Sequence, residues 1–232
     1  MTSRVALISG VLLAAGGAAW SQALELVRDG QSAYRIHHAS DAPPSVVEAA
    51  QELQRAIEAV SGARLPITTE PGDPMVALGY GAASRDAGVG LDGVALEGYR
   101  MAVRGRNLFI LGPDTGEGEW TPRGGTSAGT RNGTYAFIEA YLGVRWLTPL
   151  EHGEWVPQAP TVVLPEIDRT DAPFFLNRRL PYTQERTPAV RLWQQRQGLG
   201  HSLLLTHGHN WERPTRSEAH TSELQSPNTT SY

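Results

Sequence analysis

Apolar residues recur at helical spacing in the first third of the chain. Between residues 45 and 60 they fall four, three, four and three positions apart, on one face of a helix; they are Val46, Ala50, Leu53, Ile57 and Val60. Ser45 and Glu48 stand at capping-box spacing at the start, and Ser61-Gly62 supplies a stop. The pattern predicts an amphipathic helix that buries this stripe and tolerates polar changes at Gln54.

Short apolar or alternating stretches surround this helix and are typical of β-strands. Turn residues separate them, and they cover residues 33–38, 65–69, 75–80, 98–103 and 107–111. The last two flank Arg104-Gly105-Arg106 and predict a hairpin. Residues 112–129, rich in Gly, Pro, Ser and Thr, predict a mobile loop.

A second helical pattern lies in GTRNGTYAFIEAYLGVRWLTP, residues 129–149. Its apolar residues are spaced to bury a wide face and are Tyr135, Phe137, Ile138, Tyr141 and Leu142. Gly143 ends the helix. Residues 24–168 are therefore expected to form a domain of the α+β or α/β class, a small β-sheet with two packed helices.

The pattern changes after residue 168 to strand, helix and strand, at residues 174–180, 188–197 and 202–207. A second unit is expected over residues 169–215. The stretch RSEAHTSELQSP at 216–227 resembles the translation of a common sequencing adapter. We expect residues 216–232 to be a non-native tail that contributes to no site.

Composition excludes several classes of function. The net charge of −4 offers no basic excess for a nucleic-acid backbone, so no nucleic-acid partner is expected. All 20 basic residues are arginine, which excludes lysine-dependent chemistry. Cysteine is absent, which excludes disulfides and thiolate chemistry. No cofactor is expected.

The amino terminus has the pattern of a secretory signal. One arginine precedes an uncharged run from Val5 to Ala19, and Ser21-Gln22-Ala23 has small residues at cleavage spacing. The run is shorter than the ~20 apolar residues that span a bilayer. We therefore expect residues 1–23 to be removed and the mature protein to be secreted or periplasmic, without a membrane association.

Three stretches resemble the non-catalytic amino-terminal α/β domain of family 67 α-glucuronidases and family 20 hexosaminidases, and most closely a group of uncharacterised bacterial secreted proteins. They are AAQELQRAIEAVSGARLPI at 49–67, NGTYAFIEAYLGVRWLTP at 132–149 and EWVPQAPTVVLP at 154–165. The resemblance implies that residues 24–168 are an accessory domain and that residues 169–215 begin an incomplete (β/α)8 barrel. It also implies a carbohydrate partner, such as an oligosaccharide or a polysaccharide fragment.

The candidate binding residues follow from the same resemblance and from strand ends. Arg145 and Trp146 would lie near the junction with the barrel, where Trp146 serves either as core or as a sugar contact. Substrate-binding residues are also expected at the end of the second predicted barrel strand: His207, His209, Asn210 and Trp211. In the resembling group Trp193 and Arg196 have counterparts on the barrel helix.

Two other chemistries are open to the sequence. GGTSAGTRNG at 124–133 could cradle a phosphate at a helix start, but it has neither the GK[ST] nor the G-x-G-x-x-G pattern. His207 and His209 alternate beside Glu212, as metal ligands on a strand would, although no third ligand is defined and no metal is assigned.

No catalytic residue is assigned. Most glycosidases use two carboxyl groups across the scissile bond, and Glu139, Glu151, Glu154 and Glu185 suggest no such pair. In the resembling glycosidases these groups lie on later barrel strands. The sequence thus predicts the amino-terminal part of an exported glycoside hydrolase, α-glucuronidase-like, with this chain alone inactive. The alternatives are a non-catalytic carbohydrate-binding or surface protein and a metal-dependent hydrolase.

Overall fold

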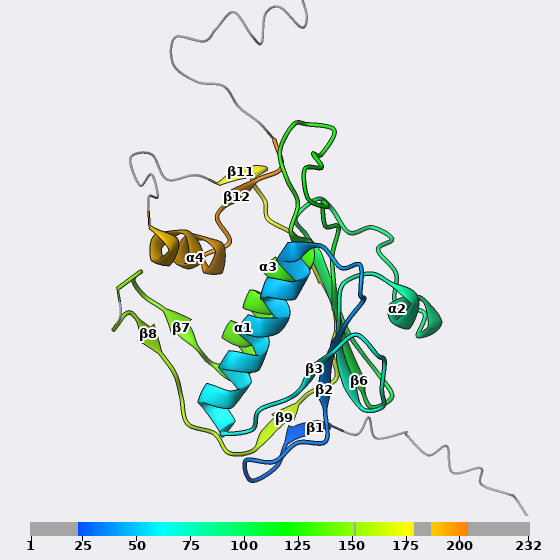
Figure 1. The fold of residues 1–232 in the computed structure, drawn as a ribbon, viewed down its shortest axis with the longest axis vertical. Coiled ribbons are helices and arrows are strands. Elements are labelled where there is room, and N and C mark those ends of the chain that lie inside the picture. Colours follow the sequence, from blue (N-terminus) through cyan, green and yellow to red (C-terminus); the bar gives the residue numbers. More distant parts are fainter. Residues whose placement is uncertain (1–22, 151, 179–186, 204–232) are drawn as a thin grey trace, which may run out of the picture.

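A mixed sheet of six strands forms the centre of the molecule (Figure 1). The computed structural model describes residues 23–150, 152–178 and 187–203. Strand order is β10-β5-β6-β4-β2-β3. The strands are β2 (Arg35–His38), β3 (Ile67–Thr68), β4 (Met75–Leu78), β5 (Tyr99–Arg104), β6 (Asn107–Leu111) and β10 (Asp168–Asp171). The first three and β6 run parallel, whereas β5 and β10 pair antiparallel at one edge.

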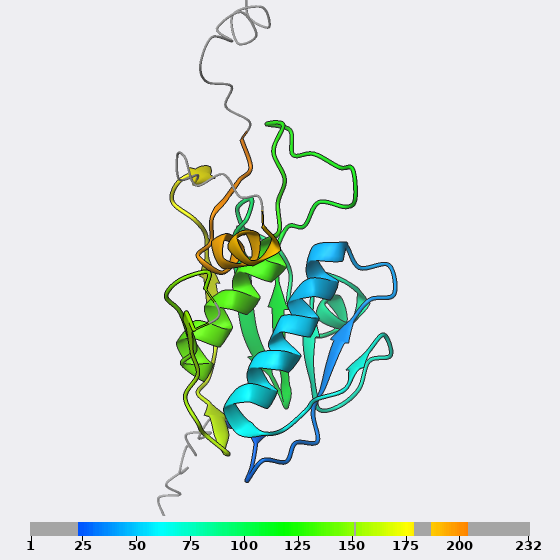
Figure 2. The same cartoon turned by 60° about the vertical axis from the view of Figure 1, so that its left-hand side comes forward.

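Helices cover one face of this sheet and a short helix lies at the other (Figures 1 and 2). α1 (Pro44–Ser61) and α3 (Gly129–Phe137), which continues as the π-helical segment η1 (Ile138–Leu142), form the larger layer. α2 (Ala82–Asp86) is on the opposite side, and α4 (Pro188–Arg196) lies next to α3. No helix of the described residues is long and apolar enough to cross a membrane.

Successive residues of the strands enter two different cores, because side chains alternate across a sheet. Ile36, Val76 and Ile110 pack under α1 and α3 in the larger core. Ala77 and Phe109, in the same strands, belong to a small core beside α2. The face with α2 is thus much less covered than the face with α1.

Three two-stranded pairs surround the sheet. They are β1 (Leu24–Val27) with β9 (Val162–Leu164), β7 (Arg145–Trp146) with β8 (Glu154–Trp155), and β11 (Asn177–Arg178) with β12 (Gly200–His201). All three are antiparallel. The expected α+β class is confirmed.

Most of the sequence-based elements of the small domain are confirmed. The whole predicted stripe of α1 is buried, and Gly62 ends the helix with φ of 80°. The hairpin is also present, since Arg104 pairs with Asn107 across Gly105-Arg106.

The predicted capping box of α1 is wrong. The helix begins at Pro44, with Pro43 as the preceding residue and no side-chain cap. Ser45 therefore lies inside the first turn, where its hydroxyl is buried without a hydrogen-bond partner. Proline at the first helical position moved the start two residues earlier than the capping pattern indicated, with Pro43 and not Ser45 before the first helical residue.

The glycines of the 129–149 motif explain why this helix lies so close to the sheet. A Cβ on Gly133 would come within 2.8 Å of Tyr99 Cβ, and one on Gly129 within 2.2 Å of the Gly98 carbonyl oxygen. Only glycine permits this approach. The predicted apolar residues of the helix are buried or partly buried, and Gly143 ends it with φ of 75°.

The start of a barrel expected after residue 168 stays a prediction, because most of its second strand, residues 202–207, lies outside the described residues. β10 crosses the expected domain boundary and continues the small domain's sheet through Asp171. α4 matches its predicted range, with the Thr187 hydroxyl capping its start. β11, within the first predicted barrel strand, pairs antiparallel with β12, which precedes the predicted second strand at 202–207. α4 packs on the helices of the small domain instead of covering a parallel pair.

Candidate functional site

The predicted junction residues Arg145 and Trp146 form strand β7 and point to opposite sides. Trp146 is only 5% exposed and meets Tyr135 edge-on, with ring centroids 5.7 Å apart. Arg145 is exposed, and its guanidinium donates to the carbonyl oxygens of Glu139 and Val144 at 2.6 and 2.9 Å. Trp146 is therefore part of the core, and the sugar contact expected for either residue stays a prediction.

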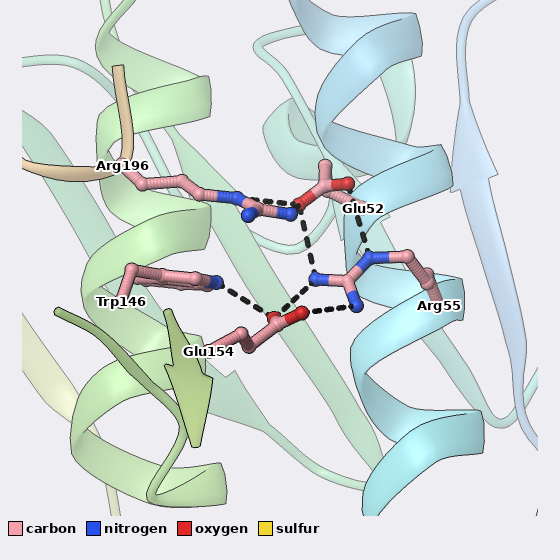
Figure 3. Close-up of polar contacts among 5 residues, drawn as sticks. All are labelled: Glu52, Arg55, Trp146, Glu154 and Arg196. Atoms are coloured by element: carbon pink, nitrogen blue, oxygen red, sulfur yellow. Dashed lines mark hydrogen bonds and ion pairs between the residues drawn. The ribbon is translucent and has the colours of Figure 1, made fainter. Parts of the chain in front are cut away.

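Trp146 belongs to a polar network that we call the junction cluster: Glu52, Arg55, Trp146, Glu154 and Arg196 (Figure 3). The indole Nε1 of Trp146 donates to Glu154 at 2.8 Å, and Arg55 donates to the same carboxylate at 2.7 and 3.0 Å. Arg55 also donates to Glu52 at 3.2 and 3.4 Å, and Arg196 donates to Glu52 at 2.7 and 3.2 Å. Two carboxylates thus balance two guanidinium groups.

The charges of the junction cluster favour the ionised form of Glu154. Burial opposes ionisation of Glu154, but the hydrogen bonds and charge of Arg55 outweigh burial and lower the pKa of Glu154. A general acid needs the opposite, a pKa raised toward neutrality. The cluster is therefore suited to holding parts together and not to proton transfer.

The parts that the junction cluster joins are α1, the β7–β8 pair and α4. Besides its bonds to Glu52, Arg196 lies over the Trp146 ring, 5.1 Å from its centroid. Trp193 and Gln197 both donate to the carbonyl oxygen of Trp146, at 3.1 and 2.7 Å. These contacts attach the helix that follows the small domain to its helical layer.

A second buried ion pair attaches β11. Arg178 donates to Glu97 at 3.0 Å, and the side chains are 15% and 7% exposed. Glu97 has φ of 59°, a left-handed conformation that costs a non-glycine residue energy. Its amide donates to Ser127 Oγ and its carbonyl oxygen accepts from Asn132, which hold the conformation in place.

The start of α3 is occupied by a carboxylate of the chain itself. Asp114 accepts from the amide of Thr130 at 3.1 Å and from its hydroxyl at 2.5 Å. Burial raises the pKa of Asp114 to about 6, against the lowering effect of these hydrogen bonds. A phosphate at this helix start would meet Asp114, so the geometry disfavours the phosphate-cradle alternative.

The remaining predicted site residues lie outside the described residues: His207, His209, Asn210 and Trp211, together with Glu212, Glu151 and Glu185. Their roles stay predictions. Within the described ranges, no group of three or more His, Asp or Glu residues is placed to hold a metal ion.

Sequence reasoning missed most of the residues that form these contacts. Glu52 and Arg55 have a local signal, because they lie three apart on one helix, where opposite charges meet. Glu97 and Arg178 have none, since nothing in either segment indicates the other.

No protein-family model and no curated protein sequence matches this chain. Among solved structures it is similar to a family GH115 4-O-methyl-α-glucuronidase with specificity for decorated arabinogalactans, at 20% identity and a TM-score of 0.49. That alignment covers 67% of this chain and 19% of the enzyme. The hexosaminidase family named from the sequence is found here too, while this α-glucuronidase is of family 115, not family 67.

Two family 20 enzymes give similar figures. The β-N-acetylhexosaminidase of Streptomyces coelicolor is 14% identical with a TM-score of 0.40, covering 68% of this chain and 25% of the enzyme. The N-acetyl-β-hexosaminidase of Streptomyces plicatus is 16% identical with a TM-score of 0.38, covering 67% and 24%. This chain spans a quarter or less of these enzymes, so the activity of the whole protein is a proposal.

Proposed function

We propose that this chain is the amino-terminal part of an exported carbohydrate-active protein, an α-glucuronidase-like glycoside hydrolase, and that the small domain is an accessory module that holds the segment after it. The observation that carries this proposal is the attachment of α4 to the small domain through the junction cluster. Glu52 and Arg196 are the partners that span the two, with side chains 15% and 12% exposed. Partly buried, charge-balanced contacts of this kind fix the orientation of one unit on another.

Three carboxylates support an accessory role, because each is hydrogen-bonded within the small domain. Glu52 and Glu154 are committed to guanidinium groups, and Asp114 is committed to Thr130. A glycosidase keeps one carboxyl group protonated beside the scissile bond and a second one free to act as nucleophile or base. We therefore expect the chemistry to depend on residues outside the described part.

Replacing Arg196 tests the attachment of α4. Arg196→Met keeps the aliphatic stem but leaves Glu52 with one guanidinium partner, so limited proteolysis should cut near α4 several-fold faster than in the native chain. Arg191→Met is the matched control, because Arg191 is exposed on the same helix. Equal cleavage rates for the native chain and both variants would refute an attachment through the junction cluster.

Two assays on the full chain test the carbohydrate part of the proposal. Gels containing soluble polysaccharides should retard the chain relative to a non-binding protein, and uniform migration in all of them would contradict a carbohydrate partner. On aryl glycosides and uronic-acid-substituted oligosaccharides the chain should show no turnover above a mock preparation. Turnover abolished by Glu154→Gln or Asp114→Asn would place the catalytic centre in the small domain and overturn its accessory role.

A further inference from the structure

The less covered side of the sheet bears a groove of about 980 Å³ that runs along its face, from Met75 and Asn107 at the starts of β4 and β6 to the loops at the carboxyl ends of β2, β4 and β6. Its walls come from the segments after β2, β4 and β6, at residues 39–43, 79–87 and 112–122. The last of these is the loop that rises above the sheet in Figure 2. Crevices outside the carboxyl ends of parallel strands are the common ligand sites of open sheets that contain them.

The base of this loop is fixed, in contrast to the mobile loop expected from its composition. Ser127 donates from its hydroxyl to the Pro113 carbonyl oxygen and from its amide to Thr115 Oγ1. Thr121 Oγ1 accepts from the Gly125 amide. The groove wall that contains Trp120 is thus held in shape by hydrogen bonds on both sides of that residue.

Two large aromatic side chains line the groove and face solvent. Trp120 is 67% exposed and Tyr80 is 47% exposed. The Arg85 guanidinium lies 5.5 Å from the centroid of the Tyr80 ring, a cation–π contact that orders the ring. Rigid aromatic faces with one polar edge suit flat ligands that combine apolar C–H faces with hydroxyl groups, as pyranose rings do.

The groove also contains a buried polar atom without a partner. His37 lies on the groove side of β2 with 8% of its surface exposed, and its Nδ1 makes no hydrogen bond. Burial lowers the pKa of His37, so the ring is neutral at pH 7 and has one donor and one acceptor nitrogen. Because a hydroxyl both donates and accepts, a ligand hydroxyl can pair with Nδ1 in either tautomer.

The charges of the lining select against anions. The ionisable side chains that line it are His37, Asp41, Asp86 and Asp114, and no arginine is among the described lining residues. A phosphate or a uronate in the groove would meet the carboxylates of Asp41, Asp86 and Asp114, whereas the Arg85 guanidinium is placed over the Tyr80 ring and does not line the groove. The ligand that fits this lining is therefore uncharged.

We propose that the groove at the carboxyl ends of β2, β4 and β6 binds a neutral oligosaccharide, with Trp120 and Tyr80 as stacking platforms. This rests on the proposed carbohydrate function and extends it, because it places a glycan contact in the small domain itself. The groove would then be a different site from one at which the whole protein recognises a uronic-acid unit.

Calorimetric titration of the full chain with xylohexaose, cellohexaose, laminarihexaose and hexagalacturonate tests the proposal. At least one neutral hexasaccharide should bind, and hexagalacturonate should not. Trp120→Ala and Tyr80→Ala should each weaken that binding about fivefold or more, the size expected for one stacked ring. Trp155→Ala is the matched control, because Trp155 is 56% exposed and outside the groove lining. The affinity of this variant for the same hexasaccharide should stay within about twofold of the native value.

Circular dichroism of each variant checks that the fold is retained, as expected for exposed positions. No binding of any neutral hexasaccharide, or equal binding of hexagalacturonate, would overturn the proposal. So would binding that survives both groove substitutions. If polysaccharide gels still retard the Trp120→Ala and Tyr80→Ala variants, only the groove is refuted and the proposed function stands; if they never retard the native chain, the proposed function fails as well.

Discussion

Asp114 shows how burial can outweigh hydrogen bonding at a single carboxylate. The two hydrogen bonds from Thr130 and the start of α3 favour the charged form, yet burial raises its pKa to about 6. The folded protein therefore binds this proton more tightly than the unfolded chain does. By linkage, Asp114 stabilises the fold fully below its unfolded pKa near 3.8 and progressively less as pH rises to about 6.

Asp114→Asn should remove this pH dependence. The free energy of unfolding of the native chain, relative to that of the variant, should fall by up to about 3 kcal/mol between pH 4 and pH 7. Urea denaturation of both proteins across that range measures the difference, and other carboxylates such as Glu154 cancel in the comparison. If the stability of the native chain relative to the variant stays constant or rises with pH, burial does not disfavour the ionised form of Asp114.

Single residues were the least predictable level of the structure. Trp146 was identified from the sequence because the resemblance places it near the junction with the expected barrel. Its partner Glu154 was considered only as a carboxylate in a loop, and Arg196 only as a residue of a resembling helix. Ion pairs between distant segments leave no local pattern, because the residues around each charged side chain do not indicate where its partner lies in the sequence.

At the scale of elements, α1 shows that periodicity identifies the buried face but not every polar contact. The stripe was predicted in full because each of its residues follows the helical repeat. Gln54 was expected to tolerate polar changes, yet its amide donates to the Leu65 carbonyl oxygen at 2.6 Å. The β7–β8 pair was not predicted, since two residues in each strand are too few to show an alternation.

Leu53→Ala should lower the free energy of unfolding by about 2–5 kcal/mol, because its fully buried side chain would leave a cavity. Gln51→Ala, on the exposed side of the same helix, should change it by less than about 0.5 kcal/mol. Gln54→Ala should fall between them, at about 1 kcal/mol for the lost hydrogen bond. Urea denaturation of the three variants ranks them, and equal losses would contradict the observed face.

At the scale of the whole molecule, β10 extends the sheet beyond the domain boundary expected at residue 168. Its four residues pair with β5, and Asp168 meets Arg100 and Arg104. The boundary expected at residue 168 follows from the extent of the resemblance and from the change of pattern after it. DRTD itself has too few apolar residues to indicate a strand. An edge strand with one exposed face gives no hydrophobic alternation, so only the pairing reveals it.

A chain of residues 24–173 should unfold cooperatively, whereas one of residues 24–166 should have a lower thermal midpoint and self-associate through the open edge of β5. Thermal circular dichroism and light scattering measure the two effects. Asp168→Ala in the full chain removes the ion pairs of Asp168 while keeping strand β10. It should change the thermal midpoint little, because these ion pairs are exposed. Identical midpoints for the two shorter chains would show that β10 adds nothing to the domain.

Pairing of the first strand with one of the last also sets an order of events in folding. Leu24 pairs with Leu164, so β1 has no partner until almost the whole domain has been synthesised. Closing so long a loop costs more entropy than closing the β5–β6 hairpin, whose strands are joined by two residues. The hairpin is therefore expected to form early and the amino-terminal strand to dock last, which would leave the beginning of the chain accessible for most of its synthesis.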